Sequence, residues 1–240
     1  MSFTLWRGVV GMVRPTRRPG NLEELIRLLP EGIGIVPLML NFKAGSNAEF
    51  AESIPLYEQF AGELAEQGVD MIMLLGAPPF MLLGPKAETK LTKQWQKRFK
   101  TPIVTDPQMH VAGLRAMKIK KFIGASYSAL QNKIVLSYMR QAGFRVLSME
   151  PIDVPFDQVA QISVETLYTH VKRLHRKHPN ADGIYIQGGG WQTVRVVELL
   201  EKDLGVPVVH ATICQAWQIH KHLSVRETKP GYGRLLAELP

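Results

Sequence analysis

The stretch ADGIYIQGGG, residues 181–190, decides the fold class of this chain. Residues 183–187 form a short, mostly apolar run, as a buried parallel strand does, and three consecutive glycines follow it. A short strand that ends in a glycine turn is typical of α/β proteins, in which ligands bind outside the carboxyl ends of the strands. The stretch therefore predicts a parallel sheet with a binding site at this turn.

Similar apolar runs alternate with helical patterns along the whole chain. This alternation is the pattern of βαβ units, which form mainly parallel sheets with helices on both faces. The fold class expected is therefore α/β. The predicted strands are residues 9–14, 33–38, 71–75, 103–105, 121–125, 145–149, 183–187 and 206–210.

The chain also repeats its own pattern at about half its length. Asp70 stands six positions before Gly76, where one strand ends, and Asp182 stands six positions before Gly188, where another ends. We therefore predict two pseudo-symmetric Rossmann-like half-domains with one small-molecule site at their interface. The first half-domain is expected at residues 1–118 and the second at 119–212. A C-terminal helix, about 213–240, is expected to return to the first half.

The composition favours a reducing compartment, with the cytoplasm as the default location. The chain has 240 residues, 45% of them hydrophobic, which is enough to form a stable core without disulfide bonds or a structural metal. Its single cysteine, Cys214, excludes a disulfide framework within the chain and a cysteine-rich metal site. No apolar run approaches the roughly 20 residues of a membrane span, and residues 1–18 lack the apolar core of a signal peptide. No membrane partner is expected.

The net charge of +8 raises the question of a nucleic-acid partner. Lysines and arginines concentrate on two predicted amphipathic helices, within residues 86–100 and 172–177. No array of stacking aromatic residues or recognition motif accompanies them, so solvated helix faces are expected and nucleic acid is not. An alternative interpretation is that the positive potential attracts an anionic substrate.

Five segments together resemble the aspartate/glutamate racemase superfamily, and most closely its branch of maleate cis-trans isomerases and arylmalonate decarboxylases. They are VVGMVRP (9–15), LLGAP (74–78), ASY (125–127), DGIYIQGGG (182–190) and LGVPVV (204–209). None is specific alone, but their order and spacing cover nearly the whole chain. The resemblance implies chemistry without a cofactor at the carbon next to a carboxylate, and it suggests a homodimer.

The resemblance also implies cysteine chemistry, which this sequence departs from. Racemases of the family place one cysteine in each half, and the decarboxylases keep only the second. Here Gly76 stands at the first position and Gly188 at the second, and Cys214 fits neither. A two-base thiol racemase is therefore excluded, and thiolate addition to a double bond is disfavoured. The carboxylate-binding loops do not depend on cysteine.

Three residues are candidates for catalysis. Tyr127 matches the family's substrate-binding tyrosine and can donate a hydrogen bond to a carboxylate or enediolate, although it could instead cap its own helix. His210 ends the last strand and could exchange protons at neutral pH in place of a thiol, although a solvated loop histidine is common. Asp106 is the candidate base, although Asp106 followed by Pro107 is also the pattern of a helix N-cap.

The candidate substrate-binding residues lie in the loops after the strands. Arg17 or Arg18 could clamp a substrate anion, although they could also belong to an exposed turn. The glycine turns offer backbone N–H groups, and Trp191 could form an apolar wall or fill the interface between helix and sheet. The full set is Thr16, Arg17, Arg18, Gly76, Ala77, Gln187, Gly188, Gly189, Gly190, Trp191 and Thr193.

No metal or dinucleotide is expected. The glycine run lacks the pattern of a dinucleotide site with its acidic residue about 20 positions on. His170, His175 and His178 lie on a basic helix without further metal ligands.

The sequence therefore favours a cofactor-independent lyase, decarboxylase, hydratase or isomerase that forms an enolate-like intermediate of a small carboxylic acid. A role in catabolism is expected only from the resemblance. The alternative from another class is a carboxylate-binding protein of the same fold that has lost catalysis, which the absence of both cysteines favours.

Overall fold

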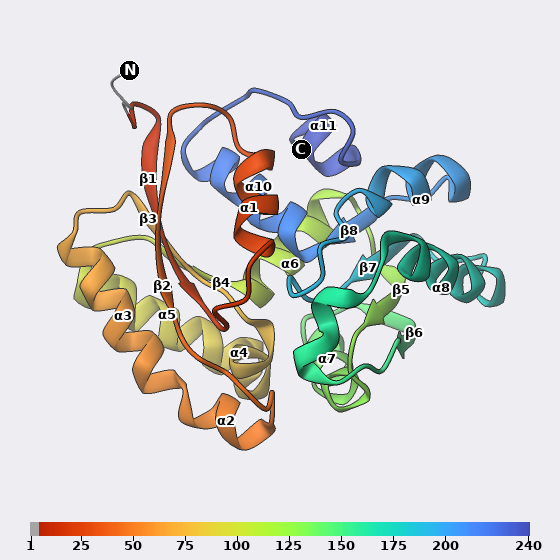
Figure 1. Ribbon diagram of the computed structural model, residues 1–240, viewed down its shortest axis with the longest axis horizontal. Coiled ribbons are helices and arrows are strands. Elements are labelled where there is room, and N and C mark those ends of the chain that lie inside the picture. Colours follow the sequence, from red (N-terminus) through yellow and green to blue (C-terminus); the bar gives the residue numbers. More distant parts are fainter. Residues whose placement is uncertain (1–4) are drawn as a thin grey trace.

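Two four-stranded parallel sheets form the centre of the computed structural model, which describes residues 5–240 (Figure 1). The first sheet has the order β2-β1-β3-β4 and the second the order β6-β5-β7-β8, so both halves share one topology. The strands are β1 (Gly8–Arg14), β2 (Ile33–Met39), β3 (Met71–Leu74), β4 (Ile103–Thr105), β5 (Lys121–Ser126), β6 (Arg145–Pro151), β7 (Gly183–Ile186) and β8 (Val208–His210). The predicted α/β fold with two similar halves is confirmed.

Helices cover both faces of each sheet, as parallel strands with crossover helices require (Figure 1). In the first half they are α1 (Asn21–Leu28), α2 (Asn47–Glu52), α3 (Ile54–Glu66), α4 (Ala77–Leu83), α5 (Pro85–Phe99) and α6 (Asp106–Ala116). The remaining ones are α7 (Ala129–Gln141), the 3-10 helix η1 (Phe156–Gln161), α8 (Val164–Lys177), α9 (Val196–Leu204), α10 (Ala211–His222) and α11 (Arg234–Glu238). Helix α10 packs against α1 and α6 of the first half.

Both halves have an aspartate that accepts a backbone hydrogen bond at the amino ends of their strands. Asp70 accepts a hydrogen bond from the backbone N–H of Val9 at 2.7 Å. Asp182 accepts one from the backbone N–H of Lys121 at 3.0 Å. Each aspartate thereby links the start of a central strand to its neighbour, far from the carboxyl ends, where the expected binding site lies.

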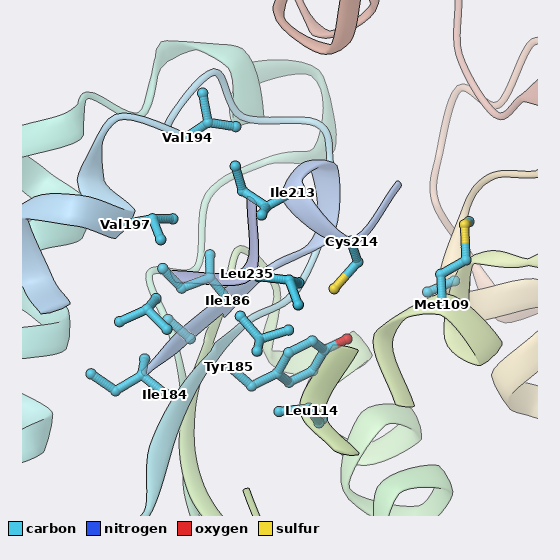
Figure 2. Packing of buried hydrophobic residues seen from close by; sticks show 14 of the residues in the cluster. Met109, Leu114, Ile184, Tyr185, Ile186, Val194, Val197, Ile213, Cys214 and Leu235 are labelled. Carbon is cyan, nitrogen blue, oxygen red and sulfur yellow. The ribbon is translucent and has the colours of Figure 1, made fainter. Parts of the chain in front are cut away.

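The core of the second half closes around strand β7, whose four residues are all buried. Figure 2 shows Ile184, Tyr185 and Ile186 packed among side chains of α6, α10 and α11, including Ile213 and Leu235. Burying each large apolar side chain stabilises the fold by about 1.5–3 kcal/mol. The C-terminal helices are therefore part of this core, and they fix the strand that ends in the glycine turn.

A buried carboxyl group joins the halves at the contact between α5 and α7. Glu88 is fully buried, and it accepts hydrogen bonds from the hydroxyls of Thr105 in the first half and Tyr138 in the second. Burial raises the pKa of Glu88 to about 7, and its two hydroxyl donors only partly oppose this rise.

This raised pKa predicts a pH-dependent stability. In the unfolded chain Glu88 titrates near 4.5, so its contribution is complete below that pH and is lost as the pH rises through 7. Glu88→Gln cannot ionise, so the wild type should lose about 3 kcal/mol relative to this variant between pH 4.5 and 7.5. Urea denaturation across this range measures the difference, with the exposed Glu66→Gln as control. Parallel stability curves for wild type and Glu88→Gln would contradict the prediction.

Candidate functional site

A cavity of about 60 Å³ lies between the two halves, with space for several water molecules or one small organic acid. Both glycine turns line it, Gly76 after β3 and Gly188 after β7, as the duplicated sequence predicted. Phenylalanines and prolines form much of the remaining wall: Pro15, Phe42, Phe50, Pro78, Pro79 and Phe156. The cavity thus lies at the carboxyl ends of the strands, where ligands bind in open α/β sheets.

The two turns have backbone conformations that suit glycine. Gly76 has φ 97° and Gly188 has φ 103°, both in the region that other residues rarely adopt. A Cβ atom on Gly188 would overlap Cε1 of the Tyr127 ring, and one on Gly76 would lie 2.8 Å from the Tyr57 hydroxyl oxygen. The two positions at which the resemblance places cysteines are therefore closed by tyrosines.

The glycine turn after β7 offers backbone donors to the cavity. Within residues 5–240, the N–H groups of Gly188, Gly189 and Gly190 meet no hydrogen-bond acceptor. The indole of Trp191 donates to the carbonyl of Gly188 at 2.6 Å and thereby fixes the turn. Trp191 itself is buried and does not line the cavity, so of its two predicted roles the structure favours filling the core over forming a substrate wall.

The turn after β3 differs, because its first donor is already used. The N–H of Gly76 donates to Asp106 Oδ2 at 2.9 Å, so this amide is not a free donor as the sequence suggested. Ala77 follows it at the start of α4 and lines the cavity, but the next two residues are prolines without an N–H.

Arg14, the last residue of β1, brings a positive charge to the cavity wall. Its side chain is buried, and Nη2 donates to Asn21 Oδ1 at 2.8 Å. Its Nε and Nη1 atoms have no hydrogen-bond partner among the described residues. Burial lowers the pKa of Arg14 while Glu23 and Asp106 raise it, and a guanidinium stays charged at neutral pH. Two unpaired donors on a buried cation are suited to a carboxylate.

Asp106 also lines the cavity, but its oxygens are engaged. Oδ2 accepts from the N–H of Gly76, Oδ1 accepts from Gln215 Nε2 at 2.8 Å, and His110 Nε2 lies 3.4 Å from Oδ1. Burial acts to raise the pKa of Asp106, but His110, Gln215 and Gly76 together outweigh it, so the pKa is lowered. The carboxylate is therefore ionised and a weak base. The N-cap of α6 is Thr105, one residue before the expected position.

Tyr127 lies against the second glycine turn with its ring edge-on to Trp191, the ring centroids 5.6 Å apart. Burial raises its pKa, although Gln131 and Arg18 oppose the rise, so the hydroxyl is protonated at neutral pH and can donate. Ser128 rather than Tyr127 is the N-cap of α7, so the structure does not support the capping alternative. At the cavity wall, the Arg18 guanidinium stacks 4.2 Å from the centre of the Phe156 ring.

His210 does not lie at the cleft rim, and this expectation is wrong. Its ring is completely buried, Nδ1 accepts from the N–H of Thr212 at 3.1 Å, and Nε2 lies 3.2 Å from the hydroxyl of Thr193. Burial lowers the pKa of His210 to about 3, so the ring is neutral. It caps α10 instead of exchanging protons with a ligand. Thr193 is buried beside it, outside the cavity wall.

The remaining candidates divide by their position in the loop after β1. Thr16 and Arg18 line the cavity, whereas Arg17 is exposed and does not. Gln187 lines the cavity together with the second glycine turn. Their roles in binding stay predictions.

Four polar lining residues were not predicted from the sequence: Arg14, Asn21, Gln131 and Gln215. The sequence pattern places Arg14 at the end of a predicted strand, and the predicted binding residues begin two positions later, at Thr16. Gln215 stands five residues beyond His210, the last residue predicted for the site. A charged residue that closes a buried strand at the carboxyl edge was the available signal, because such a residue needs a partner.

Cys214 takes no part in the cavity. Figure 2 shows its side chain among apolar groups of the core, and burial raises its pKa well above the usual range. Across residues 5–240, no group of three His, Cys, Asp or Glu side chains could hold a metal ion. In the same part of the chain, no helix is long and apolar enough to cross a membrane.

The fold and cavity define a class, an α/β protein of two similar halves with a cavity between them. The family model described as arylmalonate decarboxylase matches residues 11–236, and the chain belongs to this family. It is 25% identical over 185 residues to arylmalonate decarboxylase of Bordetella bronchiseptica, covering 74% of this chain and 75% of that protein. It is 24% identical over 230 residues to maleate isomerase of Pseudomonas putida, covering 92% and 91%.

Solved structures of both kinds of enzyme share the fold. A liganded arylmalonate decarboxylase variant superposes with a TM-score of 0.88 at 20% identity, covering 96% of this chain and 99% of that one. The maleate isomerase of Pseudomonas putida S16 gives a TM-score of 0.88 at 20% identity, covering 97% and 99%. The family model and the two sequence relatives thus confirm the predicted family branch, and the solved structures confirm its fold.

Because the Tyr127 ring fills the space beside Gly188, adding one methyl group there should lower the stability of the protein strongly. Gly188→Ala should destabilise the protein by about 2–4 kcal/mol, because strain at positive φ adds to overlap with Tyr127. Gly68→Ala is a matched control, because Gly68 has φ 72° with nothing near its Cβ position, and should cost about 1 kcal/mol. In a Tyr127→Ala background the cost of Gly188→Ala should fall by about 1 kcal/mol or more. Urea denaturation gives these differences, and an unchanged cost would disprove the overlap.

Proposed function

We propose that this chain is a cofactor-independent enzyme that acts on a small carboxylic acid, by proton transfer or bond cleavage at the carbon next to the carboxylate. The observation that carries the proposal is the buried guanidinium of Arg14, whose Nε and Nη1 atoms lack partners, in the same cavity as three free backbone N–H groups. Membership of the arylmalonate decarboxylase family supports a lyase or isomerase as the class of reaction.

Arg14 would hold the carboxylate of the substrate by charge-assisted hydrogen bonds. When a bond at the adjacent carbon breaks, its electron pair moves into this carboxylate and forms an enediolate. The N–H groups of residues 188–190 and the hydroxyl of Tyr127 then donate to the new charge, at fixed positions that need little reorganisation. The phenylalanine wall keeps water from competing for these donors.

The proton must come from a group other than a thiol. Among the lining residues, Tyr127 carries an unionised O–H next to the glycine turn, whereas Asp106 is ionised and already accepts from Gly76 and Gln215. We therefore assign proton donation to the carbon to Tyr127, with the resulting phenolate reprotonated from solvent. Asp106 would hold Gly76 and Gln215 in place.

One observation favours the second candidate function, a binding protein without catalysis. Both residues first expected to move protons are unsuited to it, because His210 is buried as a helix cap and Asp106 is a weak base. Such a protein would keep the carboxylate site and would show saturable binding without any turnover.

Nuclear magnetic resonance in deuterated water separates the two functions. Small malonates, hydroxy acids and unsaturated diacids are incubated with the protein, and deuterium uptake next to the carboxylate or loss of carbon dioxide is followed. An enzyme should act on at least one of these acids. Saturable binding of the same acids without exchange or cleavage would establish the binding protein instead.

Two variants test the assigned roles once a substrate is found. Tyr127→Phe should lower kcat at least tenfold because it removes a hydrogen bond and a proton donor from the transition state. Arg14→Gln should raise KM at least tenfold because the carboxylate loses its cation. Steady-state kinetics measures both, with Arg17→Gln as control because Arg17 is exposed outside the cavity. An unaltered kcat in Tyr127→Phe would remove this residue from the mechanism.

A further inference from the structure

Three glutamines on the cavity wall carry side-chain oxygens that lack a hydrogen-bond donor. Gln131 of α7, Gln187 at the end of β7 and Gln215 of α10 are each at most 2% exposed. Among the described residues, no donor meets the Oε1 atom of any of them. Leaving one buried acceptor unsatisfied costs about 1–3 kcal/mol, so three in one cavity need an explanation.

The orientation of one of these amides is fixed by its partner. Gln215 donates through Nε2 to Asp106 Oδ1 at 2.8 Å, and an ionised carboxylate can only accept. Its Oε1 must therefore serve as the acceptor that is left over. The side chain of Gln187 forms no hydrogen bond with the described part of the protein, so its amide can turn its oxygen toward a ligand without breaking a hydrogen bond.

The cavity therefore has two kinds of unsatisfied groups. Arg14 and residues 188–190 are donors and match the oxygens of a carboxylate. The glutamine oxygens are acceptors, and a carboxylate cannot donate to them. A ligand that satisfies both kinds must carry an O–H or N–H group in addition to its carboxylate.

We propose that the cavity selects small carboxylic acids that bear a neutral hydroxyl or amide N–H group, which donates to the glutamine oxygens while Arg14 holds the carboxylate. This inference rests on the proposed function and narrows its substrate class. Maleate, the acid named for one relative, has no such donor besides its carboxyl groups. The glutamines would therefore give this chain a substrate preference different from that of an enzyme for a diacid without a hydroxyl or amide group. A polar site discriminates strongly against an analogue that leaves its buried groups unpaired.

Calorimetric titration with matched acids tests the proposal. Hydroxymalonate is compared with methylmalonate, and malate with methylsuccinate, so that a hydroxyl replaces a methyl of similar size. The hydroxy acid should bind at least tenfold more tightly within at least one pair. In Gln187→Met this preference should fall at least fivefold. Gln192→Met is the matched control, because Gln192 is exposed on the same loop outside the cavity, and should keep the preference.

The outcomes separate this inference from the function on which it rests. Equal affinities for hydroxy and methyl acids in the wild type would overturn the inference and leave carboxylate binding intact. Failure of every acid to bind would overturn both. The wild-type ratio needs no substitution, so the proposal stays falsifiable even where Gln187→Met does not fold.

Discussion

The geometry of the cavity depends on the hydrogen bonds that one carboxylate, that of Asp106, accepts. It holds the N–H of Gly76 after β3 with one oxygen and the amide of Gln215 on α10 with the other. Gly76 and Gln215 are far apart in the sequence, and both line the same cavity. An ionised carboxylate can be buried only when donors and charge compensate it, and here Gly76, Gln215 and His110 do so. Protonating or removing the Asp106 carboxylate would free Gly76 and Gln215, and with them both walls of the cavity.

Close packing explains how this chain accommodates glycine where the family resemblance places thiols. The Tyr127 ring lies against Gly188, and Trp191 packs edge-on against that ring and binds the Gly188 carbonyl. Tyr57 occupies the corresponding space at Gly76 and donates to the carbonyl of Leu75 at 2.5 Å. The ring and the turn fit only together, because a side chain on either glycine needs the space that a tyrosine fills.

Much of the fold could be predicted from the sequence, because short apolar runs between glycines and prolines are local signals. The internal repeat of the sequence predicted that Gly76 and Gly188 would face each other across one cavity. The chemical lining was harder to predict, because it depends on packing between distant elements. Helix α10 packs on α1 and α6, which buries His210 as a cap and brings Gln215 to the cavity. Arg14 belongs to a regular strand, so only the three-dimensional structure shows that two of its three guanidinium nitrogens lack partners.

The charge balance of the cavity indicates how catalysis would proceed without a thiol or a metal-ligand cluster. Among the described residues, the charged side chains that line the cavity are two cations, Arg14 and Arg18, and one anion, Asp106, so one substrate carboxylate brings their sum close to neutral. An enediolate then adds a second negative charge. The groups left to meet it are neutral dipoles, the N–H groups of residues 188–190 and the Tyr127 hydroxyl. Neutral donors stabilise a developing charge more than the ground state, and this difference is what accelerates a reaction.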